Sequence, residues 1–279
     1  MKVKCTAIAI LAILLLTVIA TSSFPLASGQ PEKRLPVLLI HGYASDASVW
    51  ETWEQLLSND DIIFRAVTFA DDPRTFVNED KCGTAVDHAN ELNQIVEDFK
   101  TDTGSEKINI VAHSKGGLDA RVYLANDLSN NDVENLIMIG TPNLGSPLAI
   151  GSLTVPPMVY PYLINFICAP AVYDLIPGSA ATQEVKNENT RYYTIVGSWI
   201  PDPYINFISP PFDTDCSNLL WLPLQRWANI FLFWGYDDGI VPIWSSAPQG
   251  FVNIGITDNC HTNLFSEEEY KEAQEVLLR

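Results

Sequence analysis

The feature that most constrains the fold of this chain is residues 109–117, whose sequence is NIVAHSKGG. Five apolar or β-compatible residues at positions 108–112 lead into a turn of small residues, and residues 118–124 continue with helical spacing. The pattern predicts a strand, a sharp turn and a helix. A serine at such a turn is strained, so the positions two before and two after it must be small; here they are Ala112 and Gly116.

This turn makes Ser114 the candidate nucleophile. The turn lifts the hydroxyl clear of the sheet, and the following helix places the Lys115 amide and its positive end beside an oxyanion formed on an attacked carbonyl. The alternative interpretation is an ordinary strand-to-helix turn with a serine N-cap. The buried type of strand before the serine and the two glycines after it favour catalysis.

The pattern Ala-x-Ser-x-Gly at residues 112–116 resembles the nucleophile turn of the α/β-hydrolase lipases and esterases. Its first residue departs from the commoner Gly-x-Ser-x-Gly, as it also does in small lipases. The resemblance covers residues 37 to about 264, although specific motifs occupy only short stretches of that range.

Strand-like and helix-like segments alternate along the chain. We expect strands at residues 37–40, 62–69, 107–112, 133–140, 191–197 and 251–256, and helices near residues 49–57, 84–100, 115–124 and 266–278. Such alternation predicts an α/β fold with a doubly wound, mainly parallel sheet. Because few residues precede the first strand once a leader is removed, we expect about six core strands, the minimal form of the α/β-hydrolase fold.

The first 29 residues have the pattern of a secretory signal peptide. Two lysines precede an uncharged apolar run at residues 5–20, and residues 21–29 are polar or small. We therefore expect a secreted, extracellular protein with one catalytic domain at residues 30–279. An uncleaved N-terminal membrane anchor is the alternative, because the apolar run approaches the length that spans a bilayer.

The chain is strongly acidic, with a formal net charge of −18. Removing the leader leaves 14 basic and 34 acidic residues, a charge of −20. Nucleic acid and anionic membrane surfaces are therefore poor partners. The resemblance implies no cofactor; calcium near Asp202, Asp213 or Asp215 is the alternative, although acidic residues in such a chain are usually solvated.

Four cysteines follow the leader, at positions 82, 168, 216 and 260. An even number in an exported chain predicts one or two disulfides, with three possible pairings. We favour Cys168 with Cys216 because both lie in charge-poor segments. A zinc site is the alternative, but no two cysteines have CxxC spacing.

Two charge-poor segments, residues 145–183 and 197–235, interrupt the alternation. The first holds one charged residue, Asp174, and six prolines, and the second holds four of the seven tryptophans. Both would emerge at the carboxyl ends of the strands, where a parallel sheet places its site. We expect them to form a cap over Ser114, either a fixed wall of an acyl pocket or, as we favour, a movable lid that opens at a lipid–water interface.

A serine hydroxyl needs a base at neutral pH, so one of the four histidines should serve. His113 adjoins the nucleophile and points away from it, His88 lies inside a predicted helix, and His41 ends the first strand. His261 remains, five residues beyond the last strand, where the α/β-hydrolase fold carries its base. A histidine of a surface loop is the alternative.

The other site residues follow from the resemblance. Segment 234–242, WGYDDGIVP, is similar to the lipase segment whose aspartate orients the base, which implies Asp238, with Asp237 as the alternative. The sequence His41-Gly42-Tyr43 matches the His-Gly-x of lipases. This implies an oxyanion hole made by the main-chain amides of Tyr43 and Lys115, although Gly42 could also be a plain turn glycine.

These motifs predict a secreted serine ester hydrolase of the triacylglycerol lipase or carboxylesterase kind. Ser114, activated by His261 and Asp238, would attack an ester carbonyl and form an acyl-enzyme. An acyltransferase, a thioesterase or a polyester depolymerase would share every residue named. A non-catalytic binding module on the same fold is the rival of another class, and the order Ser114, Asp238, His261 argues against it.

Overall fold

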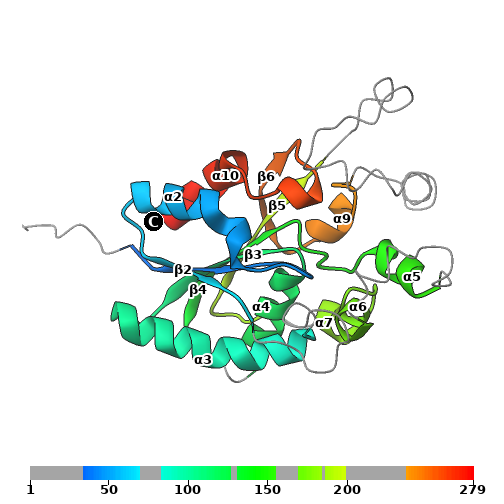
Figure 1. Ribbon diagram of the computed structural model, residues 1–279, viewed down its shortest axis with the longest axis horizontal. Helices are drawn as coiled ribbons and strands as arrows, with labels where there is room; N and C mark the ends of the chain where they lie inside the picture. The colour runs from blue at the N-terminus through cyan, green and yellow to red at the C-terminus, as the bar shows by residue number, and fades with distance from the viewer. Residues whose placement is uncertain (1–33, 70–82, 127–130, 155–168, 184–185, 199–236) are drawn as a thin grey trace, which may run out of the picture. The chain divides into compact units, whose positions relative to one another are not determined.

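One six-stranded parallel sheet organises the computed structural model (Figure 1). The structure describes residues 34–69, 83–126, 131–154, 169–183, 186–198 and 237–279. The strand order is β2-β1-β3-β4-β5-β6, and every neighbouring pair is parallel. The predicted doubly wound parallel sheet of about six strands is thereby confirmed.

The strands begin and end close to the predicted positions. They are β1 Val37–Ile40, β2 Phe64–Val67, β3 Ile108–His113, β4 Val133–Ile139, β5 Arg191–Gly197 and β6 Val252–Thr257. The largest difference is β2, which is shorter than predicted at both ends. The Ile62 amide instead donates to the Leu57 carbonyl at 3.0 Å and closes the turn before the strand.

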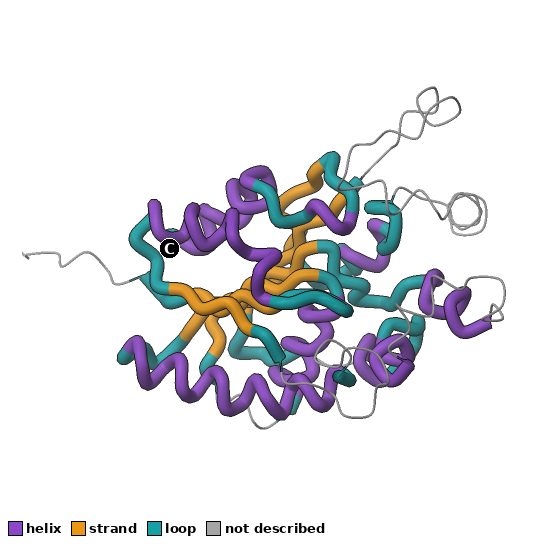
Figure 2. Tube along the Cα trace, viewed as in Figure 1, coloured by secondary structure: helices purple, strands orange, loops and turns teal. Residues whose placement is uncertain are grey.

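Helices cover both faces of the sheet (Figure 2). They are η1 Ala47–Trp50, α2 Glu51–Asn59, α3 Ala85–Thr103, α4 Lys115–Ala125, α5 Pro147–Thr154, α6 Ala169–Asp174, α7 Ala180–Gln183, α9 Ile243–Ser246, η5 His261–Asn263 and α10 Glu267–Leu277. In β1, Leu38 and Ile40 pack in the cluster that contains α3 and α4, whereas Val37 and Leu39 pack in the cluster that contains α2 and α10. Both faces of β1 are therefore buried, as its unbroken apolar sequence predicts.

Sequence signals at its two ends fix the long helix α3. Thr84 is the N-cap and forms a capping box with Asp87. Gly104 ends the helix in the left-handed conformation, with φ +62°. These signals carry α3 three residues beyond the predicted end at residue 100, because the first residue suited to stop it is Gly104.

The sheet reverses its winding between β1 and β3, which lie side by side and are followed by connections to opposite sides. The carboxyl ends of strands at such a point form the usual binding crevice of an open parallel sheet. The loop after β1 holds Gly42 and Tyr43, and the turn after β3 holds Ser114. The topology therefore brings the predicted nucleophile and the predicted oxyanion loop to one place.

Several predicted features lie outside the described residues. These are the signal peptide, Cys82, Cys168, Cys216, the three aspartates considered for calcium, and all of the second charge-poor segment after Ser198. The first segment is described at α5, α6 and α7. Within the described parts, no helix is both long and apolar enough to cross a membrane.

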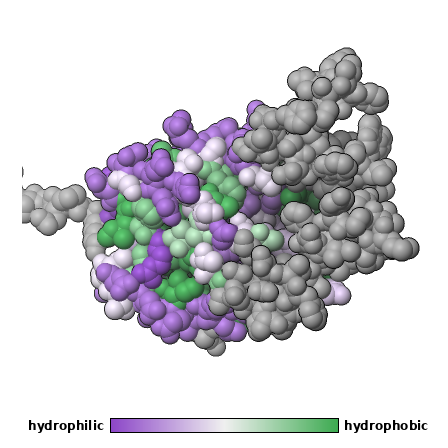
Figure 3. Space-filling model, in the orientation of Figure 1, coloured by the Kyte–Doolittle hydropathy of each residue, from purple (hydrophilic) through white to green (hydrophobic). Residues whose placement is uncertain are grey.

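Figure 3 shows mainly hydrophilic side chains over α2 and α3, with smaller apolar areas between them.

Candidate active site

Ser114 lies between β3 and α4 in a strained backbone conformation. Its φ is 53° and its ψ is −128°, a combination that non-glycine residues rarely adopt. Although Ser114 occupies the N-cap position of α4, its side chain makes no capping hydrogen bond. The hydroxyl Oγ instead lies 2.8 Å from Nε2 of His261. The serine side chain is thus directed to the predicted base rather than to the helix.

Two glycines let the neighbouring chain approach this turn closely. A Cβ on Gly116 would lie 2.3 Å from the carbonyl oxygen of His41, and a Cβ on Gly42 would lie 2.8 Å from the Cβ of Ser114. Either substitution would force the two segments apart. The close contact places the loop after β1 directly against the nucleophile, as an oxyanion hole requires.

His261 begins the short helix η5, after β6, and is buried. Its Nδ1 lies 2.7 Å from Oδ2 of Asp238, and its main-chain amide donates to the Asp238 carbonyl at 2.9 Å. Asp238 therefore holds both the ring and the backbone of the histidine. Because Nδ1 faces a carboxylate, it carries the ring proton, and Nε2 faces Ser114 as an acceptor.

Asp238 is fixed by its own loop and is 1% exposed. Its Oδ1 accepts hydrogen bonds from the amides of Ile240 at 2.9 Å and Val241 at 2.7 Å, which leaves Oδ2 for His261. The carboxylate of Asp237 accepts from the amide of Gly239 at 2.9 Å instead. Of the two aspartates considered from the sequence, the geometry places Asp238 against the histidine.

Two glycines that sequence reasoning missed make room for this pair. Gly140 follows β4 with φ +56°, and a Cβ there would lie 3.2 Å from Oδ2 of Asp238 and 3.3 Å from Nδ1 of His261. Gly197 ends β5, and a Cβ there would lie 2.7 Å from the Cβ of Asp238. The sequence signal that could have revealed them is a glycine at the carboxyl end of each of two adjacent predicted strands, β4 and β5.

His113, dismissed as the base, supports the histidine that takes its place. Its Nε2 donates to the carbonyl oxygen of His261 at 2.9 Å, and the two ring centroids are 4.8 Å apart. Burial, and then the nearby His261, keep the pKa of His113 well below its usual value. The neutral ring therefore links the end of β3 to the loop that carries His261. Sequence reasoning missed this role.

The two predicted oxyanion donors lie on segments that adjoin Ser114. Lys115 is the first residue of α4, so its amide is among those without a partner inside the helix. Tyr43 follows Gly42, and its ring packs against Ala171 of α6. The described part of the first charge-poor segment thereby contacts the loop after β1.

The loop after β1 is held by His41, which is buried. Its Nδ1 donates to the carbonyl oxygen of Gly42 at 2.8 Å. Burial lowers the pKa of His41, and the hydrogen bond to Gly42 offsets this only in part. A neutral His41 therefore braces the turn, as the sequence interpretation of a loop-fixing histidine expects.

A family model described as palmitoyl protein thioesterase matches residues 36–193, more than half of the 279 residues. The chain belongs to this family. The match includes Tyr43, Ser114 and Lys115 and ends before Asp238 and His261. As a member of the palmitoyl protein thioesterase family with the α/β-hydrolase fold, the protein is an ester hydrolase.

Solved structures share the fold of this palmitoyl protein thioesterase family member. A lipase from Bacillus licheniformis in its mature form is 20% identical, with a TM-score of 0.68 over 88% of this chain and 93% of the lipase. A metagenomic carboxyl esterase is 13% identical, with a TM-score of 0.56 over 90% of this chain and 77% of the esterase. Phospholipase PlaB from Legionella pneumophila is 18% identical, with a TM-score of 0.50 over 76% of this chain and 45% of the phospholipase.

Proposed function

We propose that the protein is a secreted serine hydrolase that cleaves carboxylic esters of apolar acids, with Ser114, His261 and Asp238 as its catalytic triad. One observation carries the proposal. Ser114 Oγ, His261 and Asp238 form a continuous hydrogen-bonded series with steps of 2.8 and 2.7 Å. Such a series is the arrangement that makes a serine hydroxyl nucleophilic at neutral pH.

In the proposed reaction, Ser114 Oγ attacks the ester carbonyl while its proton passes to Nε2 of His261. The imidazolium that forms is stabilised by Asp238, whose carboxylate accepts from Nδ1 and from two loop amides. The main-chain amides of Tyr43 and Lys115 would bind the oxyanion.

Collapse of the tetrahedral intermediate completes the first half of the reaction. His261 returns the proton to the leaving alcohol, and the acyl group stays on Ser114. Water then attacks the acyl-enzyme carbonyl and gives a proton to His261, which passes it to Ser114 Oγ as the bond between Ser114 and the acyl group breaks and the acid leaves. No cofactor takes part in the proposed steps.

Exposed apolar side chains near the site support a lipid or other apolar ester as substrate. Leu144 follows β4, and Trp244 lies in α9; they are 42% and 39% exposed. The Leu144 amide donates to the Ser245 hydroxyl at 3.1 Å, so these two segments touch. Tyr173 of α6 adds a further exposed ring. We propose that this surface meets substrate at a lipid–water interface.

A thioesterase is the second candidate, because the family model that matches the chain is that of palmitoyl protein thioesterase. The same triad and oxyanion hole would cleave an acyl thioester, with a thiol in place of the alcohol as leaving group. A pair of octanoyl substrates that differ only in an oxygen or sulfur leaving atom separates the two functions by their ratio of kcat/KM.

The test uses a short p-nitrophenyl ester with the full-length exported protein. We expect hydrolysis by the unmodified protein, inactivation by a serine-directed phosphonate, and a loss of about a thousandfold or more in Ser114→Ala. Thermal unfolding should be little changed in this variant, because a small side chain is lost at a turn. A Ser114→Ala variant that keeps a substantial part of the activity would exclude the proposed nucleophile.

A further inference from the structure

A buried charged cluster adjoins the nucleophile and takes no part in the proposed chemistry. Lys115 begins α4, Asp119 lies one turn later on the same helix, and His88 comes from α3. Lys115 Nζ lies 2.6 Å from Asp119 Oδ1, and His88 Nδ1 lies 2.7 Å from Asp119 Oδ2. The three residues are 1%, 1% and 3% exposed. Asp119 therefore ties two helices together from within the core.

Helix stability alone does not explain this cluster. A lysine in the first turn faces the positive end of the helix, and a cation placed four residues before an anion is the less favourable order. Burial adds the desolvation of the ammonium and the carboxylate, which packed apolar residues of similar volume would avoid. The arrangement therefore does not stabilise the helix, and its consequence lies in the adjoining site.

The cluster fixes the residue that carries one proposed oxyanion donor. Lys115 directly follows Ser114, and its side chain is held at the far end by Asp119. The next residue, Gly116, sits against the carbonyl of His41. Anchoring Nζ at one end and packing the backbone at the other leaves the Lys115 amide little freedom to turn.

The same cluster reaches the loop that carries the other proposed donor. The ring of His88 stacks on Phe69 at 3.9 Å and 8°, and Phe69 meets the ring of His41 edge-on at 5.4 Å. His41 in turn donates to the Gly42 carbonyl at 2.8 Å, one residue before Tyr43. A continuous path of contacts thus runs from Asp119 to the oxyanion loop.

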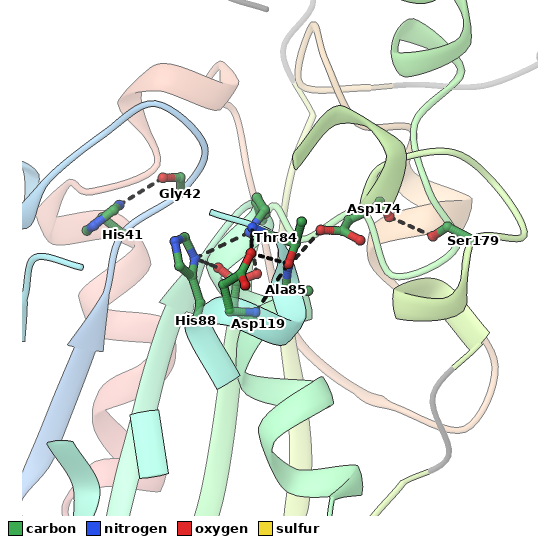
Figure 4. Close-up of polar contacts among 10 residues, drawn as sticks. His41, Gly42, Thr84, Ala85, His88, Asp119, Asp174 and Ser179 are labelled. Carbon is green, nitrogen blue, oxygen red and sulfur yellow. Dashed lines mark hydrogen bonds and ion pairs between the residues drawn. The ribbon is translucent and has the colours of Figure 1, made fainter. Parts of the chain in front are cut away.

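His88 is held in place from a third direction. It lies one turn into α3, whose first amide, that of Ala85, donates to Asp174 Oδ2 at 2.7 Å. Asp174 ends α6, and its carbonyl accepts from the Ser179 hydroxyl at 2.7 Å. Figure 4 shows the His41–Gly42, His88–Asp119, Ala85–Asp174 and Asp174–Ser179 contacts. The single charged residue of the first charge-poor segment thereby anchors the helix that presents His88.

We infer that Lys115, Asp119 and His88 form a positioning cluster that holds both main-chain donors of the oxyanion hole at the distance the transition state requires. The inference rests on the proposed function and adds three side chains that touch no substrate. Such a cluster acts through preorganisation, because donors already in place need not reorganise as charge develops on the carbonyl oxygen.

The test replaces the ion pair with apolar residues in the full-length protein, as Lys115→Met with Asp119→Leu. This double variant keeps the main-chain amide and leaves no buried charge unpaired. We expect kcat for a soluble p-nitrophenyl ester to fall about 10- to 100-fold, with KM changed less than about threefold. Affinity for a trifluoromethyl ketone, which forms the oxyanion on Ser114, should fall by the same factor as kcat/KM. Affinity for an ether of the same shape, which has no carbonyl for Ser114 to attack, should be unchanged.

Lys100→Met with Asp132→Leu is the matched control. Lys100 of α3 pairs with Asp132, whose side chain is 5% exposed. Asp132 directly precedes β4, at the amino ends of the strands, whereas Ser114 follows the carboxyl end of β3. This control should lower the unfolding temperature and leave kcat and ketone binding at wild-type values. If the cluster at Lys115 had only a structural role, the Lys115→Met, Asp119→Leu variant would likewise unfold at a lower temperature and keep wild-type kcat and ketone affinity.

Two further variants keep the inference testable if the double variant does not fold. His88→Gln keeps an N–H donor for Asp119 and should retain most of kcat, whereas His88→Leu removes the donor and should lower kcat about 3- to 10-fold. Equal kcat in these two variants, or a cluster variant with wild-type kcat and ketone affinity, overturns the inference. An unmodified protein that hydrolyses no ester overturns the proposed function itself, and the inference with it.

Discussion

At the scale of single residues, the orientation of one carboxylate decides how His261 can work. Asp238 accepts from two loop amides and from His261 Nδ1, so each of its oxygens is committed. Asp237, one residue earlier, has its side chain committed to the turn through the Gly239 amide. Asp238 therefore binds the histidine and Asp237 binds the turn, so that the same substitution at the two positions compares these roles.

We expect Asp238→Asn to lower kcat by about 10³- to 10⁴-fold, because an amide in place of the carboxylate favours the wrong tautomer of His261 and cannot balance the imidazolium. Asp237→Asn keeps a carbonyl oxygen to accept from Gly239 and should stay within about threefold of wild type. The measurement is kcat for a soluble ester at pH 8, with circular dichroism as the check of folding. The opposite ranking of the two variants would assign the role to Asp237.

The residues of the site differ in how far the sequence could reveal them. Ser114 has a local signal, since the strand, the small neighbours and the helix all lie within a few positions of it. The role of His113 has no such signal, because its partner carbonyl belongs to His261, 148 positions away. The same holds for Gly140, because the atoms that a Cβ there would meet belong to Leu264, Asp238 and His261.

At the scale of elements, the joint between β3 and η5 depends on an uncharged histidine. The His113 ring lies between the His261 carbonyl, to which it donates, and the ring of Phe265, with centroids 4.3 Å apart. A Cβ on Gly42 would approach its Nδ1 to 2.9 Å, so the second nitrogen faces the packed loop after β1. Protonating this ring would put a buried charge between two elements, and no carboxylate of the described residues is among the groups that shift its pKa.

This joint should make stability depend on pH. The pKa values of His113 and His41 are lowered in the folded protein, chiefly by burial, from the usual value of 6.5. Below pH 6.5 the unfolded chain therefore binds more protons than the folded one, and the free energy of unfolding falls as the pH falls, until the folded pKa is reached. Each histidine contributes at most about 1.4 kcal/mol per pH unit.

Chemical denaturation between pH 8 and pH 5 measures this slope. His113→Gln keeps a donor for the His261 carbonyl but does not titrate, so the decline should be shallower than in the wild type by one histidine's contribution. Above pH 7 the slopes of the two proteins should agree. A variant with an unchanged slope at every pH would show that His113 does not link protonation to folding.

The ends of helices and strands could be predicted from the sequence where the chain has a local capping or breaking residue. Strand β1 has the predicted bounds because its four apolar residues are buried on both faces and lie between a proline and a histidine. The helix predicted near residues 49–57 instead begins as η1, capped by Asp46, and continues as α2. Trp50 and Trp53 are fully buried there, against the rings of Phe265 and Tyr270, which lie more than 200 positions away in the sequence.

At the scale of the whole molecule, a strong net charge is combined with exposed apolar side chains beside the candidate site. The chain carries −18, yet Leu144, Ile150, Tyr173 and Trp244 are each at least 39% exposed and belong to segments that follow β4 or Asp238. The negative net charge of the protein repels anionic surfaces, whereas its exposed apolar side chains favour contact with uncharged lipid. The exposed apolar side chains on these segments support the proposed contact with neutral ester at the side of the candidate site.

This arrangement predicts a difference between dissolved and emulsified substrates. In the variant Leu144→Asn with Trp244→Gln, the rate on an emulsified medium-chain triacylglycerol should fall about tenfold, because the loss of apolar contact weakens adsorption by about 1–2 kcal/mol. The rate on dissolved p-nitrophenyl acetate should stay within about twofold, since neither side chain belongs to the proposed triad or oxyanion hole.

Ile63→Asn is the matched control. The Ile63 side chain is 48% exposed, but the residue directly precedes β2 at the amino ends of the strands, so both rates should match the wild type. Equal losses on both substrates would show that Leu144 and Trp244 support the site itself, and wild-type rates on both would leave the apolar surface without a part in substrate contact.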